Sequence, residues 1–222
     1  MGCRRRRLYR LVRTGRDLFP RRSAAGGQNG RYVRAVDTRE RLVEAMQDLL
    51  WERGYVGTSP RAVQERAGAG QGSMYHHFRG KADLAAAALE RTARDLGGRT
   101  EEVLTGAGSP LERLTLNLTR ERDVLRGCRV GRMTQDPEVV ADDKLRAPVD
   151  EAFRWVRRMY ADVLAEAVAA GELPDTIDPQ QVAATLVAVV QGGYVLARAS
   201  GNPADFALAV DGALSLLRGL AA

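Results

Sequence analysis

Apolar residues recur at helical spacing as soon as the arginine-rich beginning of the chain ends. We expect Asp37 to be the N-cap of a first helix, because Glu40 stands at the capping-box position three residues later. This helix should end at Gly54, since glycine is favoured just after a helix C-terminus. Its apolar positions fall on a single face: Leu42, Ala45, Met46, Leu49 and Leu50.

Three further helices are predicted next, over residues 60–67, 71–78 and 81–96. The first of them has Ser59 as a suitable N-cap and Pro60 at the favoured first helical position. Gly68 and Gly80 interrupt the pattern and separate the helices. A helix of about eight residues, a tight turn and a second short helix are the parts of a helix-turn-helix unit.

Helical periodicity continues over the rest of the chain, and no segment alternates as a strand does. Only 5% of the residues are aromatic, which also favours helices over a sandwich or barrel. We therefore predict an all-α fold with an N-terminal three-helix helix-turn-helix domain and a larger C-terminal helical domain. The C-terminal helices are predicted over residues 110–126, 133–142, 146–170, 179–199 and 203–219.

The formal net charge of +6 is distributed unevenly. Residues 1–36 contain eleven arginines and one acid, Asp17, so the rest of the chain is net acidic and the overall charge says little about nucleic-acid binding. This tail has no periodicity and is predicted to be disordered. It either clamps DNA phosphates or is an artefact of a start codon placed too far upstream, and the second interpretation is favoured.

Other features disfavour whole classes of protein. We find no apolar run of membrane-spanning length, so we expect a soluble, cytoplasmic protein with no membrane partner. Cys3 and Cys128 lie in different regions, so a structural disulfide is not expected. His76 and His77 lack the spacing of a metal site, which argues against a bound metal. Without a nucleophile–base pair or a phosphate-binding glycine loop, neither an enzyme nor a cofactor is predicted.

Several landmarks between residues 38 and 90 resemble, in register, the DNA-binding domain of the TetR family of transcriptional regulators: Thr38–Tyr55, Thr58–Ala67, Gly68, Met74-Tyr75-His76-His77-Phe78, Lys81 and Leu84. The resemblance implies a homodimeric repressor that binds palindromic, double-stranded operator DNA and is released by a small-molecule effector. It divides the chain into a tail at 1–36, a DNA-binding domain at 37–82 and an effector-binding and dimerisation domain at 83–222. A helical interaction module that no longer reads DNA is the competing hypothesis.

The start of the second short helix holds the candidates for reading DNA bases, because a recognition helix directs its N-terminal end at base edges. Gln71 can form two hydrogen bonds with adenine, and Ser73 can reach a base or a phosphate. Gly72 lets the backbone come close to the DNA. Met74 and Phe78 are four residues apart and are predicted to pack inward, bracing the helix.

Phosphate contacts are predicted on both sides of the base-reading residues, at Ser59, Arg61, Tyr75, His76 and Lys81. For Tyr75 this role rests on the resemblance, and covering of the core is the alternative. Arg61 and Lys81 could instead be ordinary solvated charges, whereas for His77 covering of the core is favoured. One departure from the family pattern is Gly70 in place of a capping Ser, which should leave the recognition helix loosely held.

The last two predicted helices are suited to dimerisation, because the resemblance pairs them with those of a second chain in a four-helix interface. Gly192 and Gly193 lie inside the first of them, at a cost of about 1 kcal/mol each. Close helix packing or a ligand lying against the backbone would explain the pair, and close packing is favoured. The apolar residues assigned to these helices are Val182, Leu186, Val189, Val190, Leu196, Leu208, Leu214 and Leu217.

Short motifs in the C-terminal domain resemble the multidrug- and flavonoid-responsive branch of the family typified by LmrA and YxaF: Gly127–Gly131, Gln191–Gly193 and Ala197–Ala199. The resemblance implies an effector cavity between the helices, and the scarcity of inward charges suggests a largely apolar ligand. Its binding is expected to tilt the helix at 81–96 and spoil the spacing of about 34 Å between two recognition helices. The residues assigned to this site are Cys128, Met133, Phe153, Met159, Tyr160, Gln191 and Tyr194, for each of which core packing is the alternative.

Overall fold

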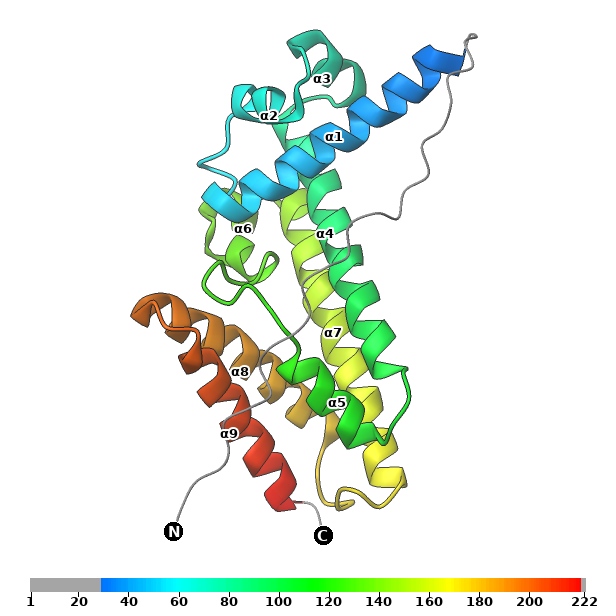
Figure 1. Cartoon of the computed structure of the whole chain (residues 1–222), viewed down its shortest axis with the longest axis vertical. Helices are drawn as coiled ribbons and strands as arrows, with labels where there is room; N and C mark the ends of the chain where they lie inside the picture. Colours follow the sequence, from blue (N-terminus) through cyan, green and yellow to red (C-terminus); the bar gives the residue numbers. More distant parts are fainter. Residues whose placement is uncertain (1–28, 221–222) are drawn as a thin grey trace, which may run out of the picture.

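The computed structural model describes residues 29–220, with side-chain surroundings given from residue 38 onward. Residues 1–28 of the predicted tail lie outside this part of the chain. Within residues 29–220 all regular elements are helices, so the all-α prediction is confirmed (Figure 1). Their bounds are α1 Asn29–Arg53, α2 Pro60–Ala67, α3 Gln71–His77, α4 Lys81–Leu104, α5 Pro110–Thr119, the 3-10 helix η1 Gly131–Gln135, α6 Pro137–Ala141, α7 Asp143–Ala169, α8 Pro179–Ser200 and α9 Ala204–Leu220.

The helix-turn-helix unit is formed largely as the local signals predict. Ser59 is the N-cap of α2, and its hydroxyl accepts a hydrogen bond from the Ala62 N–H at 3.2 Å. Gly68 ends α2 in the left-handed region, at φ +58°, which favours glycine. At its other end the unit differs from expectation, because α1 begins at Asn29 and Asp37 lies inside the helix rather than at its N-cap.

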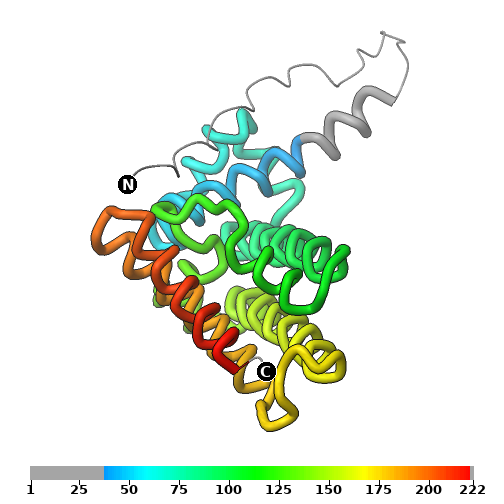
Figure 2. The backbone as a smooth tube through the Cα atoms, turned by 60° about the horizontal axis from the view of Figure 1, so that its bottom comes forward, coloured from blue at the N-terminus to red at the C-terminus, as the bar shows by residue number. Residues whose placement is uncertain are grey.

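Two long helices, α4 and α7, run side by side along the molecule, while α8 and α9 form a hairpin along another edge (Figures 1 and 2). α4 reaches Leu104, eight residues beyond the predicted end, because Gly97 does not break it. A Cβ on Gly97 would lie 3.7 Å from the Trp155 ring of α7, an ordinary contact distance, so the packing of the two helices does not require glycine at this position. A long, continuous α4 therefore connects the helix-turn-helix end to the C-terminal helices.

α5 is shorter than the predicted helix at 110–126. It begins with a capping box between Ser109 and Glu112 and ends at Thr119. The Arg122 guanidinium turns back and donates to the carbonyls of Leu118 and Asn117, at 2.8 and 2.7 Å, which satisfies the last carbonyls of the helix. The chain beyond this point is an irregular segment that lies between the two halves of the molecule.

The buried residues form two clusters. One contains the inner faces of α1–α4 and continues into Val130, Met133 and Val139 of the segment around η1 and α6, and into the start of α7. The other joins the far end of α4 to α5, α7, α8 and α9. The helix-turn-helix unit therefore shares its core with the middle of the chain instead of forming an isolated globule.

α8 is long and apolar enough to cross a membrane, by length and composition alone, since an 18-residue window within it has a mean hydropathy of 1.5. The prediction that no apolar run reaches this length is therefore wrong. In the structure α8 packs against α7 and against α9. Only 28% of the apolar window is buried within the chain, so much of its surface remains uncovered.

Candidate nucleic-acid interface and ligand cavity

The short helix α3 lies at one end of the molecule, next to α1 and α2 (Figure 1). Met74 is fully buried and Phe78 is 5% exposed, and both belong to the cluster that includes the inner face of α1. The Gln64 amide of α2 also contacts the Met74 sulfur, at 3.4 Å. The prediction that Met74 and Phe78 brace α3 is therefore confirmed.

The opposite face of α3 is open to solvent. Gln71, Gly72, Tyr75 and His76 are exposed, and Ser73 is half-buried. A Cβ added to Gly72 would meet no atom within 4 Å, so nothing within the chain requires glycine at this position. The side chains predicted to read bases and to contact phosphates thus share one accessible surface.

Lys81 is the first residue of α4, where the positive end of the helix dipole disfavours a cation. Its ammonium lies over the Tyr55 ring, 3.8 Å from the ring centroid, so a cation–π contact holds the side chain in place. A positive helix end with an added lysine is an arrangement that favours a bound anion. This geometry fits the predicted phosphate contact.

The two predicted contacts at the start of α2 are already engaged within the chain. The Ser59 hydroxyl caps α2, which leaves its own hydrogen free to donate. Arg61 forms an exposed ion pair with Glu65, with Nε–Oε1 at 2.8 Å. Because such exposed pairs contribute little to stability, the guanidinium can exchange Glu65 for a phosphate at small cost.

His77 differs from its neighbour His76 in facing the core. It is half-buried, and burial together with the nearby His76 lowers its pKa below the usual value. The imidazole is therefore neutral at pH 7, which suits a ring that packs beside Phe78. This half-buried position beside Phe78 agrees with the interpretation of His77 as covering of the core.

A cavity of two adjoining chambers, which share four lining residues, lies between α4, α7, α8 and the segment from Arg120 to η1. The inner chamber has room for about 40 Å³ and the outer one for about 560 Å³. Cys128, Phe153, Gln191 and Tyr194 line both chambers, and Tyr160 lines the inner one. Five of the seven residues assigned to the effector site from the sequence are thus brought together.

The other two assigned residues do not line this cavity. Met133 is fully buried in the cluster around α1–α4, and Met159 packs at the edge of the cluster around α5 and α7–α9. For Met133 and Met159 the alternative of core packing describes their surroundings. Core residues and cavity-lining residues both fall on the inward face of a helix. Sequence spacing therefore could not separate Met133 and Met159 from the residues that line the cavity.

Sequence reasoning missed the charged part of the cavity. Arg120 and Arg122 line the inner chamber, and Arg132 and Arg198 line the outer one. No Asp or Glu is among the residues that line either chamber in the described part of the chain. Burial and the neighbouring Arg122 lower the pKa of Arg120, and burial raises the pKa of Tyr194 to about 12.

The wall of the cavity is attached to the C-terminal end of α1. The guanidinium groups of Arg126 and Arg129 lie over the Trp51 ring, 3.6 and 4.1 Å from its centroid. The Trp51 indole N–H donates to the Gly127 carbonyl at 3.0 Å. Gly127 lines the outer chamber, so the residues that bound the cavity also contact the helix on which α3 packs.

Asp136 makes a second attachment between the same two regions. Its Oδ2 accepts hydrogen bonds from the Tyr55 and Val56 N–H groups, at 2.7 and 3.0 Å, while its Oδ1 caps α6. Gly54 precedes this contact at φ +76°, and a Cβ there would lie 2.9 Å from the Asp136 carboxylate. We name the contacts of Trp51 and Asp136 together the α1 clamp.

The outer face of the α8–α9 hairpin carries an uncovered apolar surface: Val195, Leu196, Leu208, Leu216 and Leu220 are 47–76% exposed. A groove of about 540 Å³ between the two helices continues this surface. Of the residues assigned to dimerisation, Leu196 and Leu208 are on this face, whereas Leu186, Val190, Leu214 and Leu217 are buried within the chain. The structure thus divides the assigned set between an inner and an outer face.

The two helical glycines of α8 have different surroundings. A Cβ on Gly193 would lie 3.0 Å from the Phe206 ring at the start of α9, so close helix packing explains this glycine. A Cβ on Gly192 would meet no atom within 4 Å. The favoured interpretation of close packing is therefore confirmed for Gly193 only.

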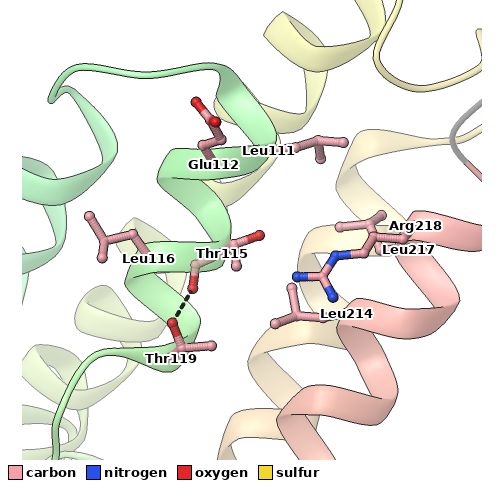
Figure 3. Close-up of a pocket in the computed structure, with 8 residues that line it drawn as sticks. All are labelled: Leu111, Glu112, Thr115, Leu116, Thr119, Leu214, Leu217 and Arg218. Atoms are coloured by element: carbon pink, nitrogen blue, oxygen red, sulfur yellow. Dashed lines mark hydrogen bonds between the residues drawn. The ribbon is translucent and has the colours of Figure 1, made fainter. Parts of the chain in front are cut away.

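A further hollow of about 450 Å³ lies on the surface between α5 and α9 (Figure 3). Thr115 and Thr119 line one side, joined by a hydrogen bond from the Thr119 hydroxyl to the Thr115 carbonyl at 2.8 Å, and Leu214 and Arg218 face them. None of the residues assigned to the effector site lines this hollow. The two-chambered cavity is therefore the better candidate for a ligand site.

Two family models match the chain. The model for bacterial regulatory proteins of the tetR family matches residues 42–88, and the tetracyclin repressor-like C-terminal domain matches residues 111–213. The chain is 30% identical over 169 residues to the transcriptional regulator AcuR of Cereibacter sphaeroides, which covers 73% of this chain and 77% of that protein. It is 28% identical over 182 residues to the HTH-type transcriptional repressor NemR of Escherichia coli K12, covering 78% and 91%.

Solved structures agree with these matches. The crystal structure of reduced E. coli NemR superposes with a TM-score of 0.72 at 26% identity, covering 84% of this chain and 97% of that one. The regulatory protein TetR from Rhodobacter sphaeroides superposes with a TM-score of 0.73, also at 26% identity, covering 80% and 97%. In each case the similarity extends over both the helix-turn-helix end and the C-terminal helices.

Proposed function

The chain belongs to the TetR family of bacterial transcriptional regulators, and from this premise we propose that it is a homodimeric repressor released from palindromic operator DNA by a small molecule. The observation that carries the proposal is the two-sided geometry of α3. Met74 and Phe78 anchor the helix in the core, while Gln71, Tyr75 and His76 remain accessible beside Lys81. A helix held in this way can enter a major groove without further folding.

We assign residues 37–82 to DNA binding and residues 83–222 to effector binding and dimerisation. The uncovered apolar face of α8 and α9 supports dimerisation, because contiguous exposed apolar surface marks protein interfaces. A second copy packed on this face would also account for the high hydropathy of α8. The family's regulators act in the cytoplasm, and we assign the chain there.

The proposed release mechanism is a change in the relative position of the two recognition helices. α4 joins the helix-turn-helix unit to the cavity through Leu96 and Thr100, which line the inner chamber. The α1 clamp supplies a second connection, since Gly127 lines the outer chamber and holds Trp51. Residues 127–131 and 191–193 resemble short motifs of the LmrA and YxaF branch. This resemblance supports a ligand site between the segment that precedes η1 and α8.

The whole proposal is tested by selecting bound sequences from a random DNA pool with the purified protein. We expect an enriched palindrome whose half-sites are separated by about one helical turn. Titration of candidate ligands into the resulting complex in a gel-shift assay should then release the DNA. A protein that enriches no sequence would contradict the proposal.

Replacement of Gln71 by alanine is expected to relax the preference at one base pair of each half-site. A good two-bond contact to a base contributes about 1–3 kcal/mol of discrimination, so the preference should fall roughly 5–150-fold while affinity for unrelated DNA stays the same. Competition binding with operators mutated at single positions measures this. Gln180→Ala, at an exposed position of α8, is the matched control. Unchanged discrimination at all positions would remove Gln71 from the base-reading set.

Replacement of Lys81 by glutamine is expected to weaken binding to all sequences alike. A dimer loses two phosphate contacts, so the slope of log affinity against log salt should become shallower by about 1.8. Lys144→Gln is a control of the same chemistry, because Lys144 is exposed at the start of α7. Filter binding between 50 and 200 mM salt measures the slope. A slope equal to that of the unmodified protein would show that Lys81 is an ordinary solvated charge.

A further inference from the structure

We propose that the ligand of the two-chambered cavity is an organic carboxylate whose carboxylate binds Arg120 in the inner chamber and whose body fills the outer chamber. This inference deepens the proposed function. It rests on that function in one respect, because it assumes that the cavity is the effector site. It replaces the expectation of a largely apolar ligand. The argument depends on the charge, the partners and the dimensions of the cavity.

Arg120 is a partly buried cation that lacks a counterion. Its Nε is buried without a hydrogen-bond acceptor, and within residues 38–220 its guanidinium makes no ion pair. Arg113 of α5 also has a buried Nε without an acceptor, but its terminal nitrogens pair with Glu166 and donate to the Leu104 carbonyl. Arginine keeps its proton even when its pKa is lowered, so the positive charge persists in the chamber. A buried charge without a partner is costly, and an entering anion would relieve that cost.

Arg122 increases the positive potential without competing for the ligand's place. Its guanidinium is held in position by two hydrogen bonds, to the Leu118 and Asn117 carbonyls at the end of α5. Tyr160 is likewise engaged, because its hydroxyl donates to the Asn117 amide oxygen at 2.9 Å. Tyr194 is neutral, since its pKa is raised to about 12, and it can act as a donor to an anion. Of the two arginines in the inner chamber, Arg120 is therefore the one whose guanidinium makes no hydrogen bond or ion pair within the described residues.

The dimensions of the inner chamber favour a carboxylate over a larger anion. Its 40 Å³ would hold roughly three water molecules, which is the space of a carboxylate and its attached carbon. A carboxylate also matches the planar fork of a guanidinium. A phosphate ester, with four oxygens around a central atom, needs more room than a carboxylate.

The outer chamber can accept the rest of the molecule. Its volume of about 560 Å³ is in the range of ordinary ligand sites. Phe153 and Tyr194 line both chambers, and Val195 lines the outer one, so apolar atoms have contacts there. Arg132 and Arg198 at the outer chamber also attract an anion toward the entrance.

Calorimetric titration of the full-length protein with matched pairs of probes tests the proposal: butyrate and butyramide, benzoate and benzamide, octanoate and octanamide. We expect at least one carboxylate to bind, and its amide to bind at least tenfold more weakly, because a hydrogen bond to a charged group contributes about 1.5–3 kcal/mol. Arg120→Gln should weaken the carboxylate at least tenfold and leave the amide unchanged. Arg120→Lys, which keeps the charge, should recover part of the affinity.

Arg157→Gln, at an exposed position of α7, is the control and should bind the carboxylate as the unmodified protein does. Equal binding of a carboxylate and its amide, tighter binding of butyl phosphate than of butyrate, or no binding by any carboxylate would overturn the proposal. The random-pool DNA selection is run separately on the same preparations. Operator binding without carboxylate binding defeats this inference alone, whereas carboxylate binding without any selected operator defeats the proposed function alone.

Discussion

Replacing Leu208 and Leu216 together by glutamate is expected to give a folded monomer that binds operator roughly 10²–10⁴-fold more weakly than the unmodified protein. Both side chains are on the outer face of α9 and are 73% and 76% exposed, so the substitutions disturb no packing within the chain. Four carboxylates would instead meet across the proposed interface, where apolar surface is otherwise buried. The affinity falls because each subunit of a dimer supplies the other with a high effective concentration at its half-site.

Sedimentation and gel-shift titration on one preparation measure the two effects together. Leu125→Glu is the control, because this leucine is 45% exposed in the segment after α5, away from the α8–α9 hairpin. The control should stay dimeric and keep its operator affinity. A Leu208/Leu216 variant that remains a dimer would place the interface elsewhere on the molecule.

The helix-turn-helix unit was largely predictable because its signals are local. Ser59 caps α2, Gly68 ends it in the left-handed region, and Met74 and Phe78 are buried at the predicted spacing. Each of these features depends on a few adjacent residues, which a sequence displays directly. The start of α1 was not predictable in the same way, because a capping pattern at Asp37 and Glu40 also occurs inside a continuing helix.

The positive charge of the cavity was not predicted because the sequence places the end of α5 seven residues too late. The segment after Thr119 is rich in good helix formers, so local propensity continues α5 to residue 126. In the structure Arg122 folds back onto the carbonyls of α5, and Arg120 enters the inner chamber. Tertiary contacts decide this end, and the expectation of an apolar ligand depended on a helix face that does not exist.

The same irregular segment gives the chain a second path between ligand and DNA. A predicted helix over 133–142 is divided at Asp136 into η1 and α6, which frees one carboxylate to bind two backbone N–H groups beyond α1. Trp51 is held only a few residues away in the same clamp. We infer that displacement of this segment by a ligand would be transmitted to α1 directly as well as along α4.

Replacing Asp136 by alanine is therefore expected to lower the free energy of unfolding by about 3 kcal/mol, through two N–H groups left without acceptors and a lost helix cap. Tyr55 is buried, so water cannot readily replace the carboxylate at its N–H. For a chain of this length such a loss corresponds to a fall in Tm of roughly 6–12 °C. Asp136→Asn should be intermediate, because one of the two oxygens is retained.

Asp178→Ala separates the clamp from ordinary capping. Asp178 is also an N-cap aspartate, accepting from the Gln180 and Gln181 N–H groups of α8, but it makes no contact with α1. Its loss should cost only about 1 kcal/mol. Thermal and urea unfolding of both variants give the comparison, and equal losses would mean that Asp136 acts merely as a cap. A larger loss at Asp136 would show that the cavity wall and the DNA-binding unit are fastened as one body, which a ligand must move together.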